Sequence, residues 1–284
     1  MTLDTPWQEA TDTGVANPRI DFSVDGALAR ITIANPAQRN AMTVAMWEQL
    51  SVLLDRVAAD DGIRAVLLSG VGERAFCSGA NIDELTQAMG DPAEMRRQNI
   101  LIRDVQLKLQ QLARPTIAVI RGACYGGGCG LALACDIRLA DASAKFAITP
   151  AKLGILYSLV DTRRLVRAVG DANARDMLLT GLPVSAARAQ QIGLVQHVAE
   201  SDALGDKTRE LVGSLLNNSQ YSLRWTKATL DYLADGALVE DGEGVEAQSA
   251  LTQAFDAAFA GGDFEEGCAA FLSGRKPQFR WPQN

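Results

Sequence analysis

The order of short apolar strands and helices along the first half of the chain most constrains its fold. The segment AVLLSG at residues 65–70 is a continuous apolar run, typical of a strand that is buried on both faces. A predicted helix at residues 94–112 precedes the strand TIAVIRG at 116–122, and a helix opening with GGCGLALA precedes the strand DIRLAD at 136–141. This alternation predicts an α/β fold with short parallel strands.

Two further elements are expected before the first of these strands. The stretch at residues 20–34 alternates apolar and polar side chains around Asp25-Gly26, which predicts a β-hairpin. A helix follows, with Thr43 as its N-cap. The apolar face of this helix consists of residues at helical spacing: Met46, Leu50, Leu53, Leu54 and Val57.

After about Asp141 the pattern changes to a succession of helices. They are expected at residues 165–169, 172–180, 186–191, 202–216, 223–233, 245–259 and 265–272. We therefore divide the chain into a flexible N-terminal tail at residues 1–17, an α/β core at 18–210 and a C-terminal helical region at 211–284. The apolar faces of the last helices need a partner, either the core or another subunit, so a homo-oligomer is expected.

The charge of the chain limits its partners. Among 284 residues, 27 are Lys or Arg and 34 are Asp or Glu, so a broad basic surface for nucleic acid or anionic lipid is not expected. Charged residues interrupt every apolar run, so no stretch of about 18 apolar residues could span a membrane. The N-terminus has no basic stretch followed by an apolar core, and we expect a cytoplasmic protein.

The cysteines show no spacing that is typical of a metal site, and the only histidine is His197. The five residues are Cys77, Cys124, Cys129, Cys135 and Cys268. A catalytic thiol usually needs a histidine partner, so reduced and buried structural cysteines are expected. The same scarcity of ligands argues against zinc, and we expect no metal.

Two glycine-rich turns are the candidate site, because each follows a strand and leads into a helix. They are FCSGANI at residues 76–82 and ACYGGGCG at residues 123–130. Glycine lets a backbone N–H approach a ligand closely, and the start of a helix adds a partial positive charge. Together the two turns could hold an oxyanion. Tight packing of a helix on a sheet is the other interpretation.

Two phosphate-binding patterns compete for the second turn. A P-loop requires Lys and Ser or Thr after its last glycine, whereas Leu131 follows Gly130 here, which excludes it. A dinucleotide fingerprint that begins with Gly126 and Gly128 would need a third glycine where Leu131 stands. The second pattern is therefore disfavoured as well.

Four motifs in order resemble those of the crotonase, or enoyl-CoA hydratase/isomerase, superfamily. They are FCSGANI, RPTIAVIRGACYGGGCGLALACDIRLAD, FAITPAKLGILY and the ending FEEGCAAFLSGRKPQF, and the resemblance covers residues 20–279. It implies a crotonase-like spiral of ββα units, followed by helices that mediate trimer formation. It also implies an acyl-CoA thioester as the ligand, with coenzyme A carried as part of the substrate and no other cofactor.

The resemblance further implies that the backbone N–H groups of Ala80 and Gly127 form an oxyanion hole for the thioester carbonyl. Losing one such preorganised donor typically costs ~3 kcal/mol of barrier. Other matches surround the ligand: Arg39 and Ala41 near the CoA, Ile82 near the adenine, Gly128 beside the thioester, and Lys276 on a CoA phosphate of a neighbouring subunit. For Arg39 and Lys276, a solvated surface charge is the other interpretation.

Two departures from the hydratases concern the reaction. One hydratase glutamate directly follows the GGGC stretch, where this chain has Gly130. The other stands four residues before the glycine of the LG pair, where this chain has Pro150. Addition of water to a double bond requires a base for the water and an acid for the α-carbon, so an ordinary hydratase is not expected.

The stretch TPAKLGILY, from Thr149 to Tyr157, is similar to one in methylmalonyl-CoA decarboxylases of the same superfamily, and this resemblance implies that Thr149 and Pro150 contact the acyl-CoA substrate. In those enzymes the tyrosine contacts the substrate carboxylate, and a histidine stands where this chain has Ala80. Loss of CO₂ forms the enolate directly, so it needs an oxyanion hole and an orienting donor but no strong base. For Tyr157, a half-buried aromatic ring whose hydroxyl bonds to backbone is the alternative.

Ser158 and Asp161 also compete to replace the glutamates. Relatives that isomerise dienoyl-CoA or displace an aromatic halide place an aspartate at the position of Ser158, whereas Asp161 is interpreted as the cap of the next helix. The resulting hypothesis is an acyl-CoA lyase or isomerase that acts through an enolate, assembled as a homotrimer or homohexamer. A methylmalonyl-CoA-type decarboxylase and a catalytically silent CoA-binding homologue are the alternatives.

Overall fold

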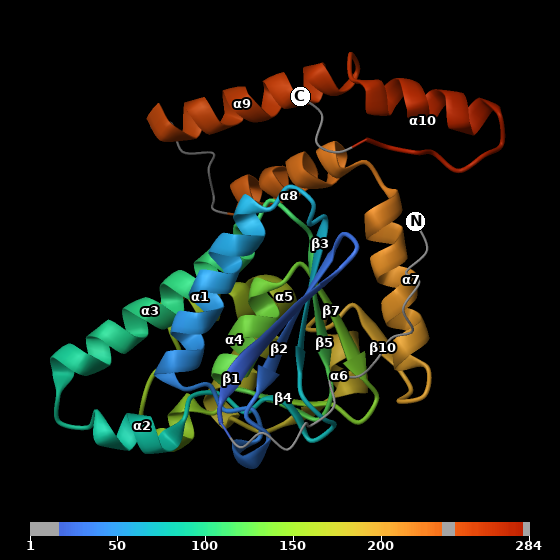
Figure 1. The fold of residues 1–284 in the computed structure, drawn as a ribbon. Helices are drawn as coiled ribbons and strands as arrows, with labels where there is room; N and C mark the ends of the chain where they lie inside the picture. The colour runs from blue at the N-terminus through green and yellow to red at the C-terminus, as the bar shows by residue number, and fades with distance from the viewer. Residues whose placement is uncertain (1–16, 235–241, 281–284) are drawn as a thin grey trace.

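A six-stranded sheet forms the centre of the computed structural model, which describes residues 17–234 and 242–280. Its strands are β1 (Arg19–Asp25), β2 (Leu28–Ala34), β3 (Ala65–Gly70), β5 (Thr116–Ile120), β7 (Ile137–Asp141) and β10 (His197–Ala199), in the order β1-β2-β3-β5-β7-β10. The first pair is the predicted antiparallel hairpin, and all later pairs are parallel (Figure 1). The predicted α/β architecture is confirmed.

A second, four-stranded sheet was not predicted from the sequence. It consists of β4 (Ala75–Cys77), β6 (Ala123–Tyr125), β8 (Lys145–Ala147) and β9 (Val184–Ser185). β3, β5 and β7 of the first sheet are each followed directly by β4, β6 and β8 of the second, so strand pairs and helices repeat along the chain as ββα units. The prediction that only helices follow Asp141 is wrong, because strands of two or three residues are too short to show an alternating pattern.

Helices from the first half of the chain cover one face of the large sheet. α1 (Val44–Ala59) and α3 (Pro92–Gln110) pack against each other, and the short α2 (Ile82–Gln87) precedes α3. Thr43 caps α1 as predicted, since its hydroxyl accepts a hydrogen bond from Met46 N at 3.2 Å. α4 (Gly127–Ala134) is almost wholly buried, because it is apolar on all sides and runs through the core.

The helix α5 (Leu159–Thr180) contains both helical stretches predicted at residues 165–180. Gly170 separates them with a non-helical backbone, at φ 76°. The N-cap of α5 is Ser158, whose Oγ accepts from Asp161 N at 3.0 Å. The interpretation of Asp161 as the cap is therefore wrong, because Asp161 lies inside the first turn and its side chain is buried.

The two faces of the six-stranded sheet pack against different helices. The larger core lies between the sheet and α1, α3, α4 and α5, and includes Ile31, Leu50 and Leu165. The smaller core lies on the other face, where Leu67 and Val119 meet Val212 of α7 (Leu204–Asn217). α6 (Ala186–Gln191) precedes β10, and α7 runs across residue 210, where the sequence places the boundary between core and C-terminal region.

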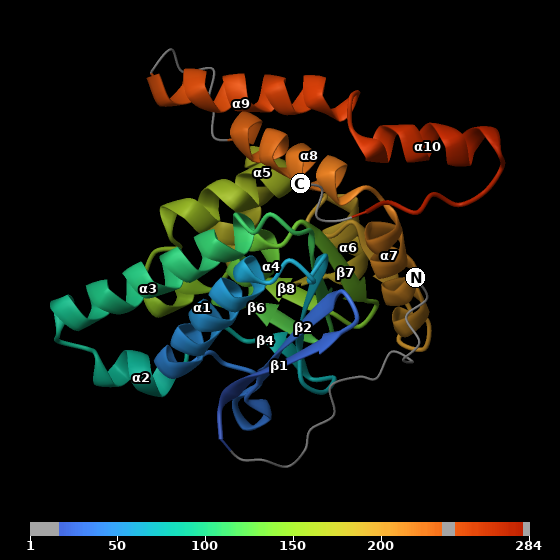
Figure 2. The same cartoon turned by 45° about the horizontal axis from the view of Figure 1, so that its top comes forward.

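The last helices lie at one end of the molecule, beyond the sheet. α8 (Gln220–Ala234) contacts α9 (Gly242–Ala258), and α10 (Gly262–Leu272) continues in the same layer (Figure 2). Cys268 of α10 is exposed, so the prediction of five buried cysteines is wrong for this one residue, whereas the other four are buried. Residues 1–16 of the predicted tail lie outside the described residues, within which no helix has the length and apolar character needed to cross a membrane.

Candidate active site

The two glycine-rich turns meet at one end of the small sheet. β4 and β6 are parallel neighbours, with Cys77 opposite Cys124, so the turns that follow them leave the sheet side by side. A Cβ atom placed on Gly79 would lie 3.4 Å from Gly127 N and 3.2 Å from Tyr125 O. Gly79 and Gly126 have φ values of 106° and 49°, which other residues rarely adopt. Each positive-φ glycine directly precedes one of the two residues predicted to form the oxyanion hole.

The N–H groups of Ala80 and Gly127 have no hydrogen-bond acceptor within the described residues. The neighbouring groups are paired: Met42 N donates to Gly79 O at 2.8 Å, and Asn81 N donates to Met42 O at 3.0 Å. Gly127 is the first residue of α4, where backbone N–H groups have no partner inside the helix. Two free donors from adjacent turns, one of them at a helix start, can together stabilise an oxygen that gains negative charge.

These turns border a cavity of about 430 Å³ near α2, at the end of the molecule opposite α9 and α10 (Figure 1). Six of the predicted site residues line it: Ala41, Ala80, Ile82, Gly127, Thr149 and Pro150. The remaining lining residues are Gln38, Ser78, Gly79, Asn81, Asp83, Leu85, Gly126, Leu153 and Ile155. The structure therefore brings together segments that the sequence places far apart.

Four other predicted residues lie outside the lining of this cavity: Arg39, Gly128, Lys276 and Tyr157. Arg39 is exposed beside it, and its carbonyl oxygen accepts from Ser78 N at 3.1 Å, which ties its turn to the first glycine turn. Gly128 packs on β4, since a Cβ atom there would lie 2.2 Å from Cys77 O. Lys276 is exposed and follows α10, far from the cavity in the same chain.

Tyr157 lies next to the second glycine turn. Its hydroxyl donates to Gly126 O at 3.3 Å, on the residue that precedes the free N–H of Gly127. Burial, together with the nearby Asp161 carboxylate, raises the pKa of the Tyr157 hydroxyl well above its ordinary value. The hydroxyl therefore stays protonated at neutral pH and can act only as a neutral hydrogen-bonding group.

A polar network on the rim of the cavity was not predicted. Gln38 Oε1 accepts from Asn81 Nδ2 at 2.6 Å, and Gln38 Nε2 donates to Asp83 Oδ2 at 3.1 Å. Asn81 also caps α2 through Glu84 N at 3.1 Å. The signal in the sequence is the Asn-x-x-Glu spacing, which is typical of a helix start and places the free Ala80 N–H directly before it.

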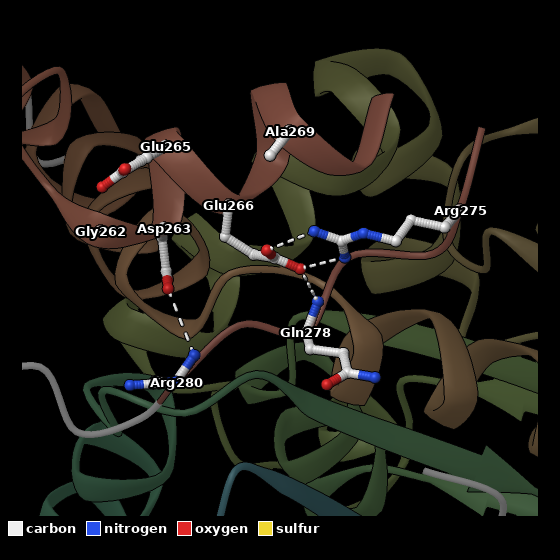
Figure 3. A pocket seen from close by; sticks show the side chains of 8 residues that line it. All are labelled: Gly262, Asp263, Glu265, Glu266, Ala269, Arg275, Gln278 and Arg280. Carbon is white, nitrogen blue, oxygen red and sulfur yellow. Dashed lines mark hydrogen bonds and ion pairs between the residues drawn. The ribbon is translucent and has the colours of Figure 1, made fainter. Parts of the chain in front are cut away.

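A larger cavity, about 780 Å³, lies between α10 and the segment that follows it, and several hydrogen bonds join this segment to α10 (Figure 3). Arg275 binds Glu266 at 2.6 Å and 2.7 Å, and Gln278 N donates to Glu266 at 2.6 Å. The hydrogen bond from Arg275 lowers the pKa of Glu266 to about 2. We assign this cavity to the anchoring of the C-terminal segment, because Glu266 and Asp263 of α10 accept hydrogen bonds from Arg275, Gln278 and Arg280 of that segment.

The buried thiols are poor nucleophiles. Burial raises the pKa of Cys77 to about 12 and that of Cys135 to about 12, so both are protonated at neutral pH. Across residues 17–234 and 242–280, no cluster of three or more His, Cys, Asp or Glu side chains could hold a metal ion.

Similar proteins share this fold and most of its length. Residues 23–282 match a family model described as enoyl-CoA hydratase/isomerase. The Delta(3,5)-Delta(2,4)-dienoyl-CoA isomerase of Dictyostelium discoideum is 33% identical over 272 residues, covering 92% of this chain and 90% of that protein. The short-chain-enoyl-CoA hydratase of Clostridium acetobutylicum is 30% identical over 255 residues, covering 89% and 94%. A solved structure of enoyl-CoA hydratase from Bacillus anthracis has a TM-score of 0.81 at 30% identity, covering 92% and 98%.

Proposed function

Since the chain belongs to the enoyl-CoA hydratase/isomerase family, we propose that it stabilises the enolate of an acyl-CoA thioester in the cavity beside Ala80 and Gly127. The observation that carries the proposal is the pair of N–H groups without acceptors, each placed by a positive-φ glycine. The family resemblance read from the sequence is confirmed, and acyl-CoA is the substrate class of this family. The reaction itself is the proposal.

Enolate formation suits this arrangement of donors. When a proton or a carboxylate leaves the α-carbon, its electron pair moves toward the thioester oxygen, and the charge on that oxygen rises. Preorganised backbone donors stabilise the charged state more than the neutral thioester, so they lower the barrier and not merely the energy of binding. In the described residues neither N–H group has a protein acceptor, so both remain available to the thioester oxygen.

We propose a lyase or an isomerase and not an ordinary hydratase. Hydration needs an acid and a base that face the substrate from two sides. Gly130 and Pro150 carry no ionisable group, and the one carboxylate among the cavity-lining residues is Asp83, which accepts a hydrogen bond from Gln38. Isomerisation by proton transfer, or loss of a leaving group, requires fewer such groups.

A methylmalonyl-CoA-type decarboxylase is the second candidate. It is favoured by the hydrogen bond from Tyr157 to Gly126 O, because this contact holds the hydroxyl beside the second glycine-rich turn. In that position the hydroxyl could orient a substrate carboxylate. A catalytically silent CoA-binding protein is the third possibility. We further propose that the active form is a homotrimer or homohexamer, with acyl-CoA as the only partner besides other copies of the chain.

A panel of substrates separates these candidates. The protein is assayed against enoyl-CoA, dienoyl-CoA and malonyl-type CoA thioesters, and CoA binding is measured by calorimetry. We expect turnover of an isomerase or decarboxylase substrate. We also expect hydration of crotonyl-CoA to be slower by ~10²–10⁴-fold for each missing acid–base group. Binding without any turnover would favour the silent homologue, and hydration at the rate of an ordinary hydratase would contradict the proposal.

A further inference from the structure

The first turn of α5 carries a buried acid that the proposed reaction does not yet use. Asp161 is 5% exposed, and its Oδ2 accepts from Ser158 Oγ at 2.8 Å. Its Oδ1 lies 3.1 Å from Arg164 Nη1, on the same helix. Carboxylates are almost never fully buried unless they are paired, and here the partners fix the direction in which the carboxylate points.

That direction is toward α4, next to Gly130. A Cβ atom placed on Gly130 would lie 2.8 Å from Asp161 Oδ1 and 2.5 Å from Gln106 Nε2. The carboxylate of Asp161 therefore occupies the volume that any side chain at position 130 would need. Gly130 is one turn along α4 from Gly127, so both lie on the same face of that helix. The Asp161 carboxylate of α5 thus lies beside a residue of α4 that is one helical turn from Gly127, whose N–H group is proposed to bind the thioester oxygen.

The hydrogen bonds around Asp161 leave one buried donor without a partner in the described residues. It is Arg164 Nη2, on a residue that is 6% exposed, whereas the Gln106 side chain bonds to the Asp161 carboxylate and helps to lower its pKa. Gln106 Oε1 accepts from Arg164 Nη1 at 3.1 Å, which turns the amide nitrogen toward Gly130. A cluster that only stabilises the fold is expected to satisfy its buried donors, because an unpaired buried donor loses its hydrogen bonds to water without replacing them. The open donor of Arg164 indicates a place for an oxygen atom that the chain itself does not supply.

We infer that Asp161, which lies beside Gly130 and outside the residues that line the cavity, is the proton-holding group of the active site, and that Gly130 leaves room for its carboxylate. This inference rests on the proposed enolate chemistry. Asp161 takes the α-proton: the C–H bond breaks, its electron pair forms the carbon–carbon double bond of the enolate, and the carbonyl pair moves to the oxygen held by Ala80 and Gly127. In the reverse step the enolate carbon takes the proton back from the Asp161 carboxyl group. Arg164 holds the carboxylate in position.

The charged surroundings suit both protonation states. Burial raises the pKa of Asp161, whereas Ser158 and Arg164 act to lower it. Tyr157 is the other titratable group near the carboxylate, and it remains neutral because its own pKa is raised. A carboxylate whose pKa is raised is a stronger base than an exposed aspartate, which favours removal of the α-proton.

The test is exchange of the α-protons of butyryl-CoA in D₂O, followed by NMR, in the full-length protein. Asp161→Asn keeps the hydrogen-bonding shape and removes the base, so exchange should fall ~100-fold or more while CoA affinity is unchanged. Asp176→Asn, on the exposed side of the same helix, is the matched control and should exchange like the wild type. Equal exchange by Asp161→Asn and the wild type would overturn the inference alone. A wild type that binds CoA without exchange would overturn the proposed function together with it.

The spatial claim has a test that does not depend on activity. Gly130→Ala should lower the melting temperature of the wild type, because its Cβ collides with Asp161 and Gln106. In an Asp161→Gly background the same substitution should cost clearly less, since half of the obstruction is gone. Strictly additive effects in this double-mutant cycle would show that the two positions do not share one space. Gly130→Glu combined with Asp161→Gly should restore exchange by returning a carboxylate to that space.

Discussion

The α/β body, formed by the two sheets and the helices α1 to α7, buries its large apolar side chains, whereas the C-terminal helices α9 and α10 leave theirs exposed. In the body, large residues such as Phe76, Phe146 and Leu50 are fully buried between the sheets and helices. In α9 and α10, by contrast, the only buried hydrophobic residues that the structure describes are Ala254 and Ala270. Four large apolar residues of α9 and α10 are exposed, and so is Phe259 between the two helices: Phe255, Phe264, Phe271 and Leu272 are the four.

This difference shows which region buries its apolar side chains within a single chain and which region does not. The body closes its own core, so its glycines and buried polar groups are fixed by contacts within one chain. The C-terminal helices leave several large apolar side chains exposed, and such a surface usually marks an interface. The active site belongs to the first region, whereas Lys276 belongs to the second.

The largest expected effect comes from adding one methyl group to the body. Gly128→Ala would place a Cβ atom 2.2 Å from Cys77 O, a backbone atom that cannot move without disturbing β4. Overpacking typically costs 1–3 kcal/mol and sometimes more, so we expect a loss of about 3 kcal/mol and a melting temperature lower by roughly 10 °C. Thermal unfolding at fixed protein concentration measures it.

The matched control lies in α10. A Cβ atom on Gly267 would have as its nearest neighbour Phe279 Cε1, at 3.7 Å, an ordinary contact. Gly267→Ala should therefore leave the melting temperature unchanged or raise it slightly, since alanine favours a helix by up to about 1 kcal/mol over glycine. If both variants melted like the wild type, the contrast in packing between the two regions would be refuted.

The next prediction concerns assembly. Phe271 is 86% exposed in the single chain, and we expect the wild type to have the mass of a trimer or hexamer by light scattering. Phe271→Asp should shift the mass toward the monomer, because a central aromatic residue of an interface contributes about 2–4 kcal/mol to association. Val52→Asp, on the exposed side of α1, should leave the mass unchanged. Dissociation by Val52→Asp but not by Phe271→Asp would place the interface on the body.

A pair of tyrosines tests whether function is confined to the body. Both hydroxyls donate to a backbone carbonyl: Tyr157 to Gly126 O at 3.3 Å, and Tyr221 to Ala254 O at 2.8 Å. Tyr157→Phe should lower kcat about tenfold to hundredfold, since a hydrogen bond to a charged group is worth ~1.5–3 kcal/mol. Tyr221→Phe should change stability and leave kcat near the wild-type value. An unchanged kcat for Tyr157→Phe would assign this residue to packing alone.

The sequence predicted the elements whose pattern is local. The hairpin around Asp25-Gly26, the Thr43 cap and the strand at residues 65–70 could be found because alternation, capping and apolar runs are visible within a short window. The second sheet could not, since β4, β6 and β8 have three residues each and are defined by pairing with distant strands. Short strands have no sequence period of their own.

The candidate site also contains residues that a local sequence pattern could reveal and residues that only distant contacts define. The two glycine turns were visible, and the structure brings Ala80 and Gly127 together at one cavity as the family resemblance implied. The position of Asp161 was not visible, because its burial depends on contacts with α3 and α4 that are remote in sequence. Ser158 and Asp161 have the spacing of a capping box, and this signal could have identified Ser158 as the cap.

The smallest expected effect is that of Lys276→Ala on the Kd for CoA, and it tests whether the C-terminal region of one copy contributes to the site on the body of another. Lys276 is exposed, and we propose that it contacts a CoA phosphate in a neighbouring copy of the chain. An exposed ion pair is worth about 0–1 kcal/mol, so Lys276→Ala should raise the Kd for CoA about two- to fivefold, with a smaller effect at high salt. Lys207→Ala, on α7, removes a surface lysine that is paired with Glu210 at 2.7 Å and should not change the Kd.

Calorimetry of both variants is then repeated in the Phe271→Asp background. If Lys276 acts across an interface, its effect should disappear once the copies separate, because no neighbouring site remains within its reach. An effect that persists in the monomer would mean that Lys276 reaches the CoA of its own chain, and an absent effect in the oligomer would make it an ordinary surface charge.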